Sequence, residues 1–299
     1  MKKLAVIIFR SPGQDPRKHE MEENILAALA SDPDVAAAMA PHLYDLREAD
    51  AAVASLRSVT GPLVVLAWLY PRAIHWTLDR LGIKGQRGET QLRRDDPEDE
   101  KRKDSASAPN ASARTIWSLD LRDNDDTATH VAEIQRILRD LHAVSANAGP
   151  AASVTLPSVI RMQPSGVSLS RWYPVIDFGR CNDCMECLDF CLFGVYGVDD
   201  DGHVVVESPD NCKKGCPACS RVCPQNAILF PMHRTPAIAG APGASFDARK
   251  LDLSELFGAP AAVQLAAAER NAALAGAEKE AKPRDNLDKL MDALDDAKL

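Results

Sequence analysis

The residues of this chain with the clearest chemical potential are its eight cysteines, all of which fall between positions 181 and 223. The first run of four has the spacing C-x2-C-x2-C-x3-C and consists of Cys181, Cys184, Cys187 and Cys191. The second has the spacing C-x3-C-x2-C-x3-C, is followed directly by Pro224, and consists of Cys212, Cys216, Cys219 and Cys223. Thiolates are soft ligands that suit iron–sulfur clusters and zinc. Cysteines set this closely therefore predict metal chemistry.

The spacing favours two four-iron clusters over the other uses of cysteine. Three thiolates on a tight loop can bind three irons of one cubane, and a fourth on a short helix can reach a neighbouring cubane. Structural zinc sites usually have pairs of cysteines separated by a longer spacer. Zinc, a disulfide framework and a single cluster with surplus thiols remain alternatives to the two clusters.

Residues 172–235, about a fifth of the chain, resemble the bacterial-type 2[4Fe-4S] ferredoxins, whose run is C-x2-C-x2-C-x3-C-P. The first run departs from this pattern at Leu192, where the proline would stand, and the second opens with one extra residue. In this family the fourth cysteine of each run binds the cluster of the other run. The resemblance thus implies that one cluster is held by Cys181, Cys184, Cys187 and Cys223. It implies that the other is held by Cys212, Cys216, Cys219 and Cys191.

Apolar segments on both sides of each cysteine run indicate an internal duplication, in which Asp200-Asp201-Gly202 makes a hairpin turn between the halves. We expect an apolar shell that limits water near the clusters, made by Leu188, Phe190, Phe193 and Phe230. The segment carries nine Asp and Glu against five Lys and Arg, a net of about −4. An acidic surface around a redox centre favours a protein redox partner with a basic docking face.

The elements that precede the cysteines predict a small α/β domain over residues 1–146. Strands are expected at 4–9, 41–46, 62–69 and 114–121, and helices at 19–30, 48–58, 72–82 and 127–145. Strands that alternate with helices of this length imply a parallel sheet with flanking helices. The polar, highly charged stretch 84–113 is expected to be a mobile insertion in this domain.

The loop after the first expected strand, residues 10–16, lacks both G-x-G-x-x-G and the Walker pattern, so nucleotide binding is not supported. The order of elements is faintly similar to the class II chelatases of cobalamin and sirohaem synthesis. Asp15-Pro16 agrees with that pattern, whereas Arg10 and Ser11 stand where a metal-handling histidine is expected. His75 is the one histidine placed near the carboxyl end of an expected strand. This resemblance implies an alternative in which the α/β domain acts on a small molecule or tetrapyrrole.

Two further segments connect and follow these domains. Residues 147–171 are punctuated by glycine and proline and are expected to be a linker. Residues 236–299 are expected to be a second linker and a helical tail, giving a ferredoxin-like α+β module at 172–235 between them. In the tail an apolar stripe at helical spacing, which predicts either docking on its own domain or a partner-binding helix, consists of Leu287, Leu290, Met291 and Leu294.

Composition narrows the functional class. The formal net charge of −8 and the isoelectric point near 5.4 do not suggest a nucleic-acid partner. The longest apolar run, residues 63–70, is far shorter than the ~20 residues of a membrane span. We therefore expect a cytoplasmic location, where thiols stay reduced. The preferred interpretation is an electron carrier or redox subunit rather than a stand-alone enzyme. The alternatives are an enzyme supplied with electrons by the clusters, and a scaffold that its clusters merely hold folded.

Overall fold

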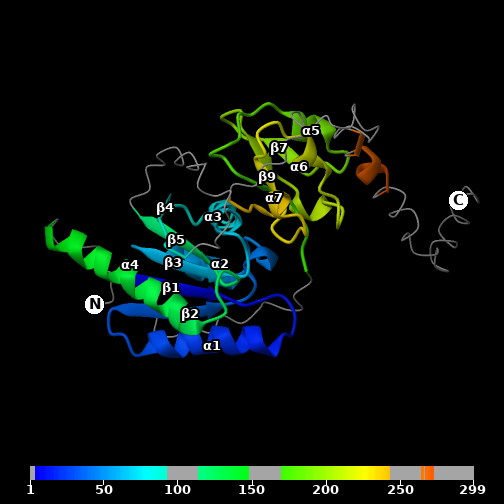
Figure 1. Ribbon diagram of the computed structural model, residues 1–299. Coiled ribbons are helices and arrows are strands. Elements are labelled where there is room, and N and C mark those ends of the chain that lie inside the picture. Colours follow the sequence, from blue (N-terminus) through cyan, green and yellow to red (C-terminus); the bar gives the residue numbers. More distant parts are fainter. Residues whose placement is uncertain (1–3, 93–113, 148–169, 243–263, 266, 273–299) are drawn as a thin grey trace, which may run out of the picture.

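A computed structural model describes residues 4–92, 114–147, 170–242, 264–265 and 267–272. Its N-terminal part is built on a five-stranded parallel sheet in the order β2-β1-β3-β5-β4 (Figure 1). The strands are β1 (Leu4–Phe9), β2 (Val35–Ala40), β3 (Leu63–Ala67), β4 (Gln86–Arg87) and β5 (Thr115–Asp120). Every residue of β1, β2 and β3 is buried, as expected for parallel strands covered on both faces. The predicted α/β domain is confirmed.

Helices cover the two faces of this sheet. Leu4, Val6 and Ile8 of β1 pack against α1 (Pro16–Ala30) and α4 (Thr127–Asn147), whereas Ala5, Ile7 and Phe9 pack toward α2 (Ala51–Ser58) and α3 (Pro71–Arg80). This alternation follows from the two-residue period of a strand, which sends successive side chains to opposite faces. Each face therefore has its own hydrophobic core.

The second strand was predicted in the wrong place. The expected strand at 41–46 instead contains a 3-10 turn, η1 (Leu43–Asp45), and the strand is β2 just before it. Four of the six residues of β2 are alanine, which has low intrinsic strand propensity. Pairing along the whole length of β1 decides the matter, because it satisfies the backbone groups of β2 that face β1 and holds the small side chains of β2 in the interior.

The predicted insertion at 84–113 is partly described. Residues 84–92 include β4, and Glu133 of α4 accepts hydrogen bonds from the Thr90 hydroxyl at 3.0 Å and the Gln91 N–H at 2.9 Å. Residues 93–113 lie outside the described residues, so their predicted mobility stays a prediction.

The cysteine-bearing part is a small α+β unit, which we call the cysteine module (the described residues 170–242). It consists of two antiparallel strand pairs, three short α-helices and a 3-10 turn. In chain order these are β6 (Val175–Ile176), α5 (Glu186–Phe190), β7 (Tyr196–Val198), β8 (Val204–Val206), η3 (Pro209–Asn211), α6 (Ala218–Val222), β9 (Ile228–Leu229) and α7 (Pro236–Ala239). Strand β6 pairs with β9 and β7 with β8. The predicted hairpin is confirmed, with Gly202 at φ +87° in its turn.

The cysteine module and the α/β domain share one core. Tyr173, Val175 and Leu229 belong to the same hydrophobic cluster as α2 and α3. Tyr173 also stacks on Tyr44 with ring centroids 4.3 Å apart, and its hydroxyl donates to the Tyr44 carbonyl at 3.0 Å. Figure 1 shows the module seated on the α2 and α3 side of the sheet.

The expected linker and tail are described only in part. Arg171 closes the expected linker and is itself buried, donating from Nη1 to the Leu46 carbonyl at 2.7 Å and from its N–H to the Asp45 carboxylate at 3.0 Å. Residues 148–169 and the predicted tail stripe lie outside the described residues. A helical segment at 264–265 and 267–272 lies beside the cysteine module (orange in Figure 1). In the described ranges, helices are too short or too polar to cross a bilayer.

Candidate metal centres

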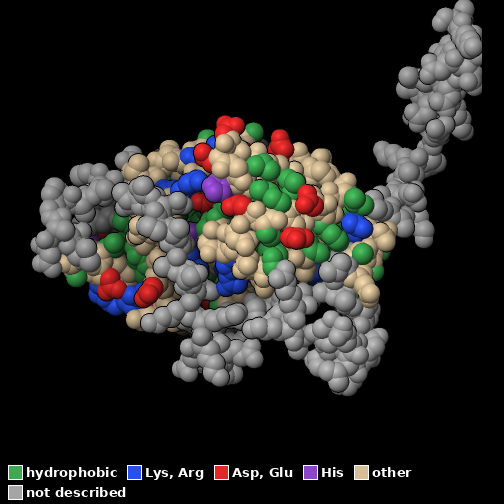
Figure 2. All heavy atoms as spheres, turned by 90° about the horizontal axis from the view of Figure 1, so that it is seen from above, with side chains coloured by type: hydrophobic (Ala, Val, Ile, Leu, Met, Phe, Trp, Pro, Cys, Tyr) green, Lys and Arg blue, Asp and Glu red, His purple; other side chains and the backbone are tan. Residues whose placement is uncertain are grey.

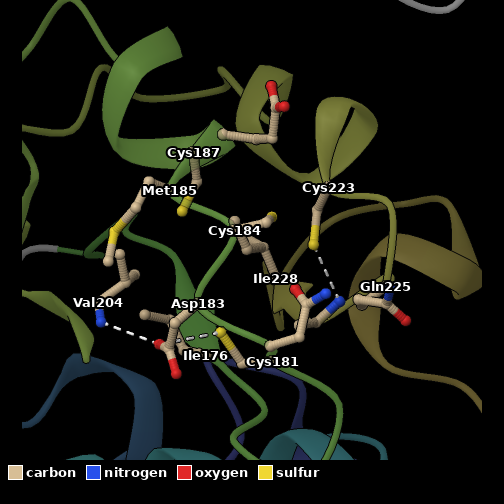
Figure 3. Close-up of a pocket in the computed structure, with 13 residues that line it drawn as sticks. Ile176, Cys181, Asp183, Cys184, Met185, Cys187, Val204, Cys223, Gln225 and Ile228 are labelled. Atoms are coloured by element: carbon tan, nitrogen blue, oxygen red, sulfur yellow. Dashed lines mark hydrogen bonds between the residues drawn. The ribbon is translucent and has the colours of Figure 1, made fainter. Parts of the chain in front are cut away.

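Four of the predicted ligands line one cavity. Space of about 340 Å³, part of it open to solvent, is bordered by the thiols of Cys181, Cys184, Cys187 and Cys223. Figure 3 shows these four side chains around the space, with Ile176, Ile228 and Met185 beside them. Three of the thiols come from the loop after β6 and the first turn of α5, and the fourth directly follows α6. We call this the first cavity.

The loop of the first cavity bends through backbone conformations that side chains rarely adopt. Asp183 has φ +53° and Met185 has φ +63°. Such residues cost of order 1–3 kcal/mol each and persist where the surroundings hold them. The Asp183 carboxylate supplies that hold, because it accepts from the Val204 N–H at 3.1 Å and contacts His203 Nδ1 at 2.9 Å. The hydrogen bond from His203 also lowers the pKa of Asp183.

The other four predicted ligands line a second cavity of about 320 Å³, also partly open to solvent. They are Cys191, Cys212, Cys216 and Cys219. Phe190 and Phe193 border the same space, as the expected apolar shell requires. Leu188 and Phe230 lie in the core that packs around the cysteines. All four predicted shell residues therefore lie near the thiols.

The extra residue that opens the second run is accommodated at Gly215. This glycine has φ +82°, and a Cβ built there would meet no atom within 4 Å. The turn is closed by the Cys216 N–H, which donates to the Lys213 carbonyl at 3.0 Å. A left-handed glycine thus absorbs the longer x3 spacing and returns the chain to Cys216.

We expect Gly215→Ala to weaken metal retention at the second cavity. Since nothing crowds the site, the change costs about 1–2 kcal/mol of backbone strain alone. The matched control is Gly202→Ala, at φ +87° with equally open space in the β7–β8 turn. Iron content after dilution into chelator checks this: G215A should lose iron faster than wild type and G202A should not. Equal loss in both variants would contradict a specific role for the Gly215 turn.

The grouping of the cysteines crosses between the two runs. Cys223 ends the second run but lines the first cavity, and Cys191 ends the first run but lines the second. Each follows directly on its short helix, α6 or α5, and these helices pack against each other. The structure therefore brings together the two sets that the resemblance implies. Their binding of iron stays a prediction.

Burial makes several of the thiols poor acids. Burial, followed by the charges of Cys223 and Cys181, raises the pKa of Cys187 to about 12. Burial is also the main cause of the raised pKa values of Cys212 and Cys219. Protein thiolates are nonetheless the species that bind metal. A cavity lined by thiols that burial keeps protonated therefore fits an occupant that supplies positive charge.

The thiols of each set line the walls of a cavity instead of converging on one position, where a single metal ion could bind. Across the described ranges, His, Cys, Asp and Glu side chains do not gather in threes as a single metal ion would need. A four-iron cluster makes a different demand, because each thiolate binds its own iron at a corner of the cluster. The donor set of each cavity fits such a cluster.

Sequence reasoning missed the buried arginine that ties the α/β domain to the first cavity. Arg72 of α3 donates from Nε to the Asp177 carboxylate and from Nη2 to the Asn226 carbonyl at 2.6 Å. The Asp177 carbonyl accepts from the Cys181 N–H at 2.9 Å, and the Asn226 N–H donates to the Cys223 carbonyl at 3.2 Å. One side chain thus joins both chain segments that deliver thiols. A charged residue amid the otherwise apolar stretch 63–74 was the available signal.

The residues singled out for the chelatase resemblance have structural roles. Asp15 caps α1 by accepting from the Arg17 N–H at 3.1 Å, and Arg10 pairs with Glu23 at 2.6 Å. His75 is buried in α3 beside Trp76, and burial, together with the charge of Arg87, lowers its pKa to about 4. An imidazole with that pKa is neutral at neutral pH.

Comparison with known proteins finds local similarity to two proteins of Methanocaldococcus jannaschii. The chain is 47% identical over 66 residues to an uncharacterized ferredoxin. The aligned residues make up 22% of this chain and 44% of that ferredoxin. The chain is also 38% identical over 55 residues to pyruvate synthase subunit PorD. These aligned residues make up 18% of this chain and 62% of that subunit. The chain thus spans less than two thirds of either relative. No protein-family model matches it. The predicted likeness to chelatases receives no support from these findings.

Proposed function

We propose that this chain holds two [4Fe-4S] clusters in residues 172–235 and passes single electrons to or from a protein oxidoreductase. The observation that carries the proposal is the pair of cavities, each bordered by four cysteines in a crossed set. Similarity to a ferredoxin and to a pyruvate synthase subunit supports the same function. Bound clusters would supply reversible one-electron chemistry.

In this proposal Cys181, Cys184, Cys187 and Cys223 hold one cluster, and Cys212, Cys216, Cys219 and Cys191 hold the other. The side chains around them exclude water, which is one of the factors that set cluster potential. We also propose that the chain consists of an α/β domain at 1–146, a linker at 147–171, the ferredoxin-like domain at 172–235 and a linker with a helical tail at 236–299. We propose a cytoplasmic location for the protein.

The surface near the cavities supports a basic redox partner. Cys184, in the first cavity, is exposed, and Leu192, next to Cys191 of the second, is 58% exposed. Seen from above in Figure 2, acidic side chains surround hydrophobic ones on this side of the molecule. The exposed acidic residues of this part include Glu186, Asp189, Asp199, Asp200 and Asp201. Such a surface speeds encounter with a basic face more than it strengthens binding.

Metal analysis tests the proposal directly. Protein purified without oxygen should be brown and contain about eight iron and eight acid-labile sulfide per chain. Dithionite should bleach it reversibly, because each cluster takes up one electron. Colourless protein with bound zinc would contradict the proposal. Full iron content without reversible reduction would favour the scaffold alternative.

One observation favours a second candidate function, an enzyme whose α/β domain acts on a small molecule or tetrapyrrole with electrons from the clusters. Parallel α/β sheets bind ligands at the carboxyl ends of their strands. Helix α3 begins four residues after β3 ends, and its Arg72 reaches the segments that bear Cys181 and Cys223. A co-purifying flavin or tetrapyrrole would support this candidate, and its absence together with rapid reduction by a redox protein would count against it.

A further inference from the structure

A helical segment far along the chain lies against the second cavity. This cover segment comprises residues 264–265 and 267–272 (orange in Figure 1). Its Glu269 pairs with Arg221 of α6, with Nε and Oε2 2.8 Å apart. Its Arg270 reaches α5, where Nη1 donates to the Phe190 carbonyl at 3.4 Å. The cover segment thus contacts α5 and α6, the two short helices that directly precede Cys191 and Cys223.

Arg270 borders the second cavity itself. Its guanidinium lies over the Phe190 ring, 4.6 Å from the centroid, and its side chain lines the same space as the four thiols. Its Nε is buried and finds no hydrogen-bond acceptor among the described residues. Buried donors nearly always have a partner, so an unsatisfied N–H beside a thiol-lined cavity indicates that the occupant supplies the acceptor.

The two cavities differ in this respect. Neither lysine nor arginine is found among the described residues that line the first cavity, whereas Arg270 is a cation lining the second. The aromatic ring beneath the guanidinium and the ion pair at Glu269 hold the segment from two sides. The cationic group therefore has a defined place at only one of the two sites.

From this geometry we propose that Arg270 donates a hydrogen bond from Nε to a sulfur of the cluster held by Cys191, Cys212, Cys216 and Cys219. The bond raises the reduction potential of that cluster. Reduction adds one electron from a reduced protein partner and makes or breaks no covalent bond. Since the reduced cluster carries one more negative charge, a nearby cation and donor stabilise it more than the oxidised form. The inference rests on the proposed function, because it requires the second cluster.

The test is an anaerobic redox titration of the full-length, cluster-loaded protein and three variants. Arg270→Met keeps the apolar stem and removes the charge and the donors, whereas Arg270→Lys keeps the charge. Arg234→Met removes the same charge from an exposed position in the same module and is the matched control. Potentials of both clusters are read from electron paramagnetic resonance spectra during the titration.

In R270M we expect the equilibrium constant for reduction of one cluster to fall about tenfold, a shift of 59 mV toward negative potential for a one-electron couple. The reduction potential of the other cluster should not change. R270K should recover most of the shift, and R234M should show none. Selective loss of one cluster in R270M, with the other intact, would also support contact with that cluster.

Two failures can be told apart. Wild-type protein without clusters would overturn the proposed function. Wild-type protein with both clusters, together with R270M whose two potentials are unchanged, would overturn the role of Arg270 alone. Equal shifts in R270M and R234M would also overturn it, because they would reflect net charge rather than a bond at the cluster.

Discussion

Replacing Cys181 and Cys223 together with alanine is expected to remove one cluster and leave the other intact. The two thiols stand 42 residues apart in the sequence, in different runs, but line the same cavity. In the crossed set they serve one cluster, so that site keeps only two of its four ligands. The other site keeps all four. We therefore expect about four iron per chain and the spectrum of one reduced [4Fe-4S] cluster.

The matched variant is Cys181→Ala with Cys191→Ala, which removes the same number of thiols from a single run. These two cysteines line different cavities. Each site then lacks one ligand, so neither should retain an intact four-iron cluster. Iron analysis and electron paramagnetic resonance of the two double variants, prepared side by side, check the assignment.

The reverse result would contradict the crossed set. If each run held its own cluster, C181A/C191A would keep one intact cluster and C181A/C223A would keep none. Two intact clusters in either variant would show that the replaced thiols are not ligands. The comparison decides the ligand sets even if both variants are less stable than wild type, because it depends on which one retains a four-iron cluster.

Replacing Arg72 with methionine is expected to destabilise the protein by about 3–5 kcal/mol, the usual cost of removing one partner of a buried ion pair. The Arg72 side chain is 2% exposed and that of Asp177 is 6% exposed. Methionine would leave the Asp177 carboxylate in the interior with Arg180 Nε, 3.6 Å away, as its remaining cationic neighbour. The measurement is urea unfolding of the loaded protein without oxygen, followed by circular dichroism and by cluster absorbance.

Arg17→Met is the matched control for this prediction. Arg17 and Arg72 each follow a proline at the first position of a helix, α1 or α3. The Arg17 side chain is 90% exposed and its Nε lies 3.6 Å from Asp15 Oδ1, so its loss should cost no more than about 1 kcal/mol. Adding Asp177→Asn to R72M should restore part of the lost stability, because it removes the charge left behind.

The site of cluster loss gives a second readout. Arg72 bonds the segments that bear Cys181 and Cys223, so R72M should release the cluster of the first cavity sooner than that of the second. Simultaneous loss of both clusters at the global unfolding midpoint would mean that Arg72 supports the fold without organising that site. A cost equal to that of R17M would mean that the pair does not hold the two parts together.

Much of the candidate site was predictable because its information is local. The cysteine spacing fixes which thiols share a loop, and the resemblance to ferredoxins supplies the crossed grouping that the cavities reproduce. The alternation of apolar runs predicted the α/β domain, because strand and helix periods are also local properties. The prediction failed at β2, where alanines carry little strand propensity and only pairing with β1 reveals the strand.

The tertiary structure alone decided which polar residues matter around the cysteines. Pro16-Arg17 and Pro71-Arg72 look alike in the sequence, yet the Arg17 side chain is in solvent and that of Arg72 is buried against Asp177. Arg270 lies 47 residues after the last cysteine, and nothing in the sequence indicated that it borders a thiol-lined cavity. The physical reason is the same in both cases. Burial and charge pairing arise where distant segments pack together, whereas the chain itself specifies only what its neighbours along the sequence can form. The spacing of the eight cysteines was enough to predict their role, whereas the residues that surround them could be identified only from the tertiary structure.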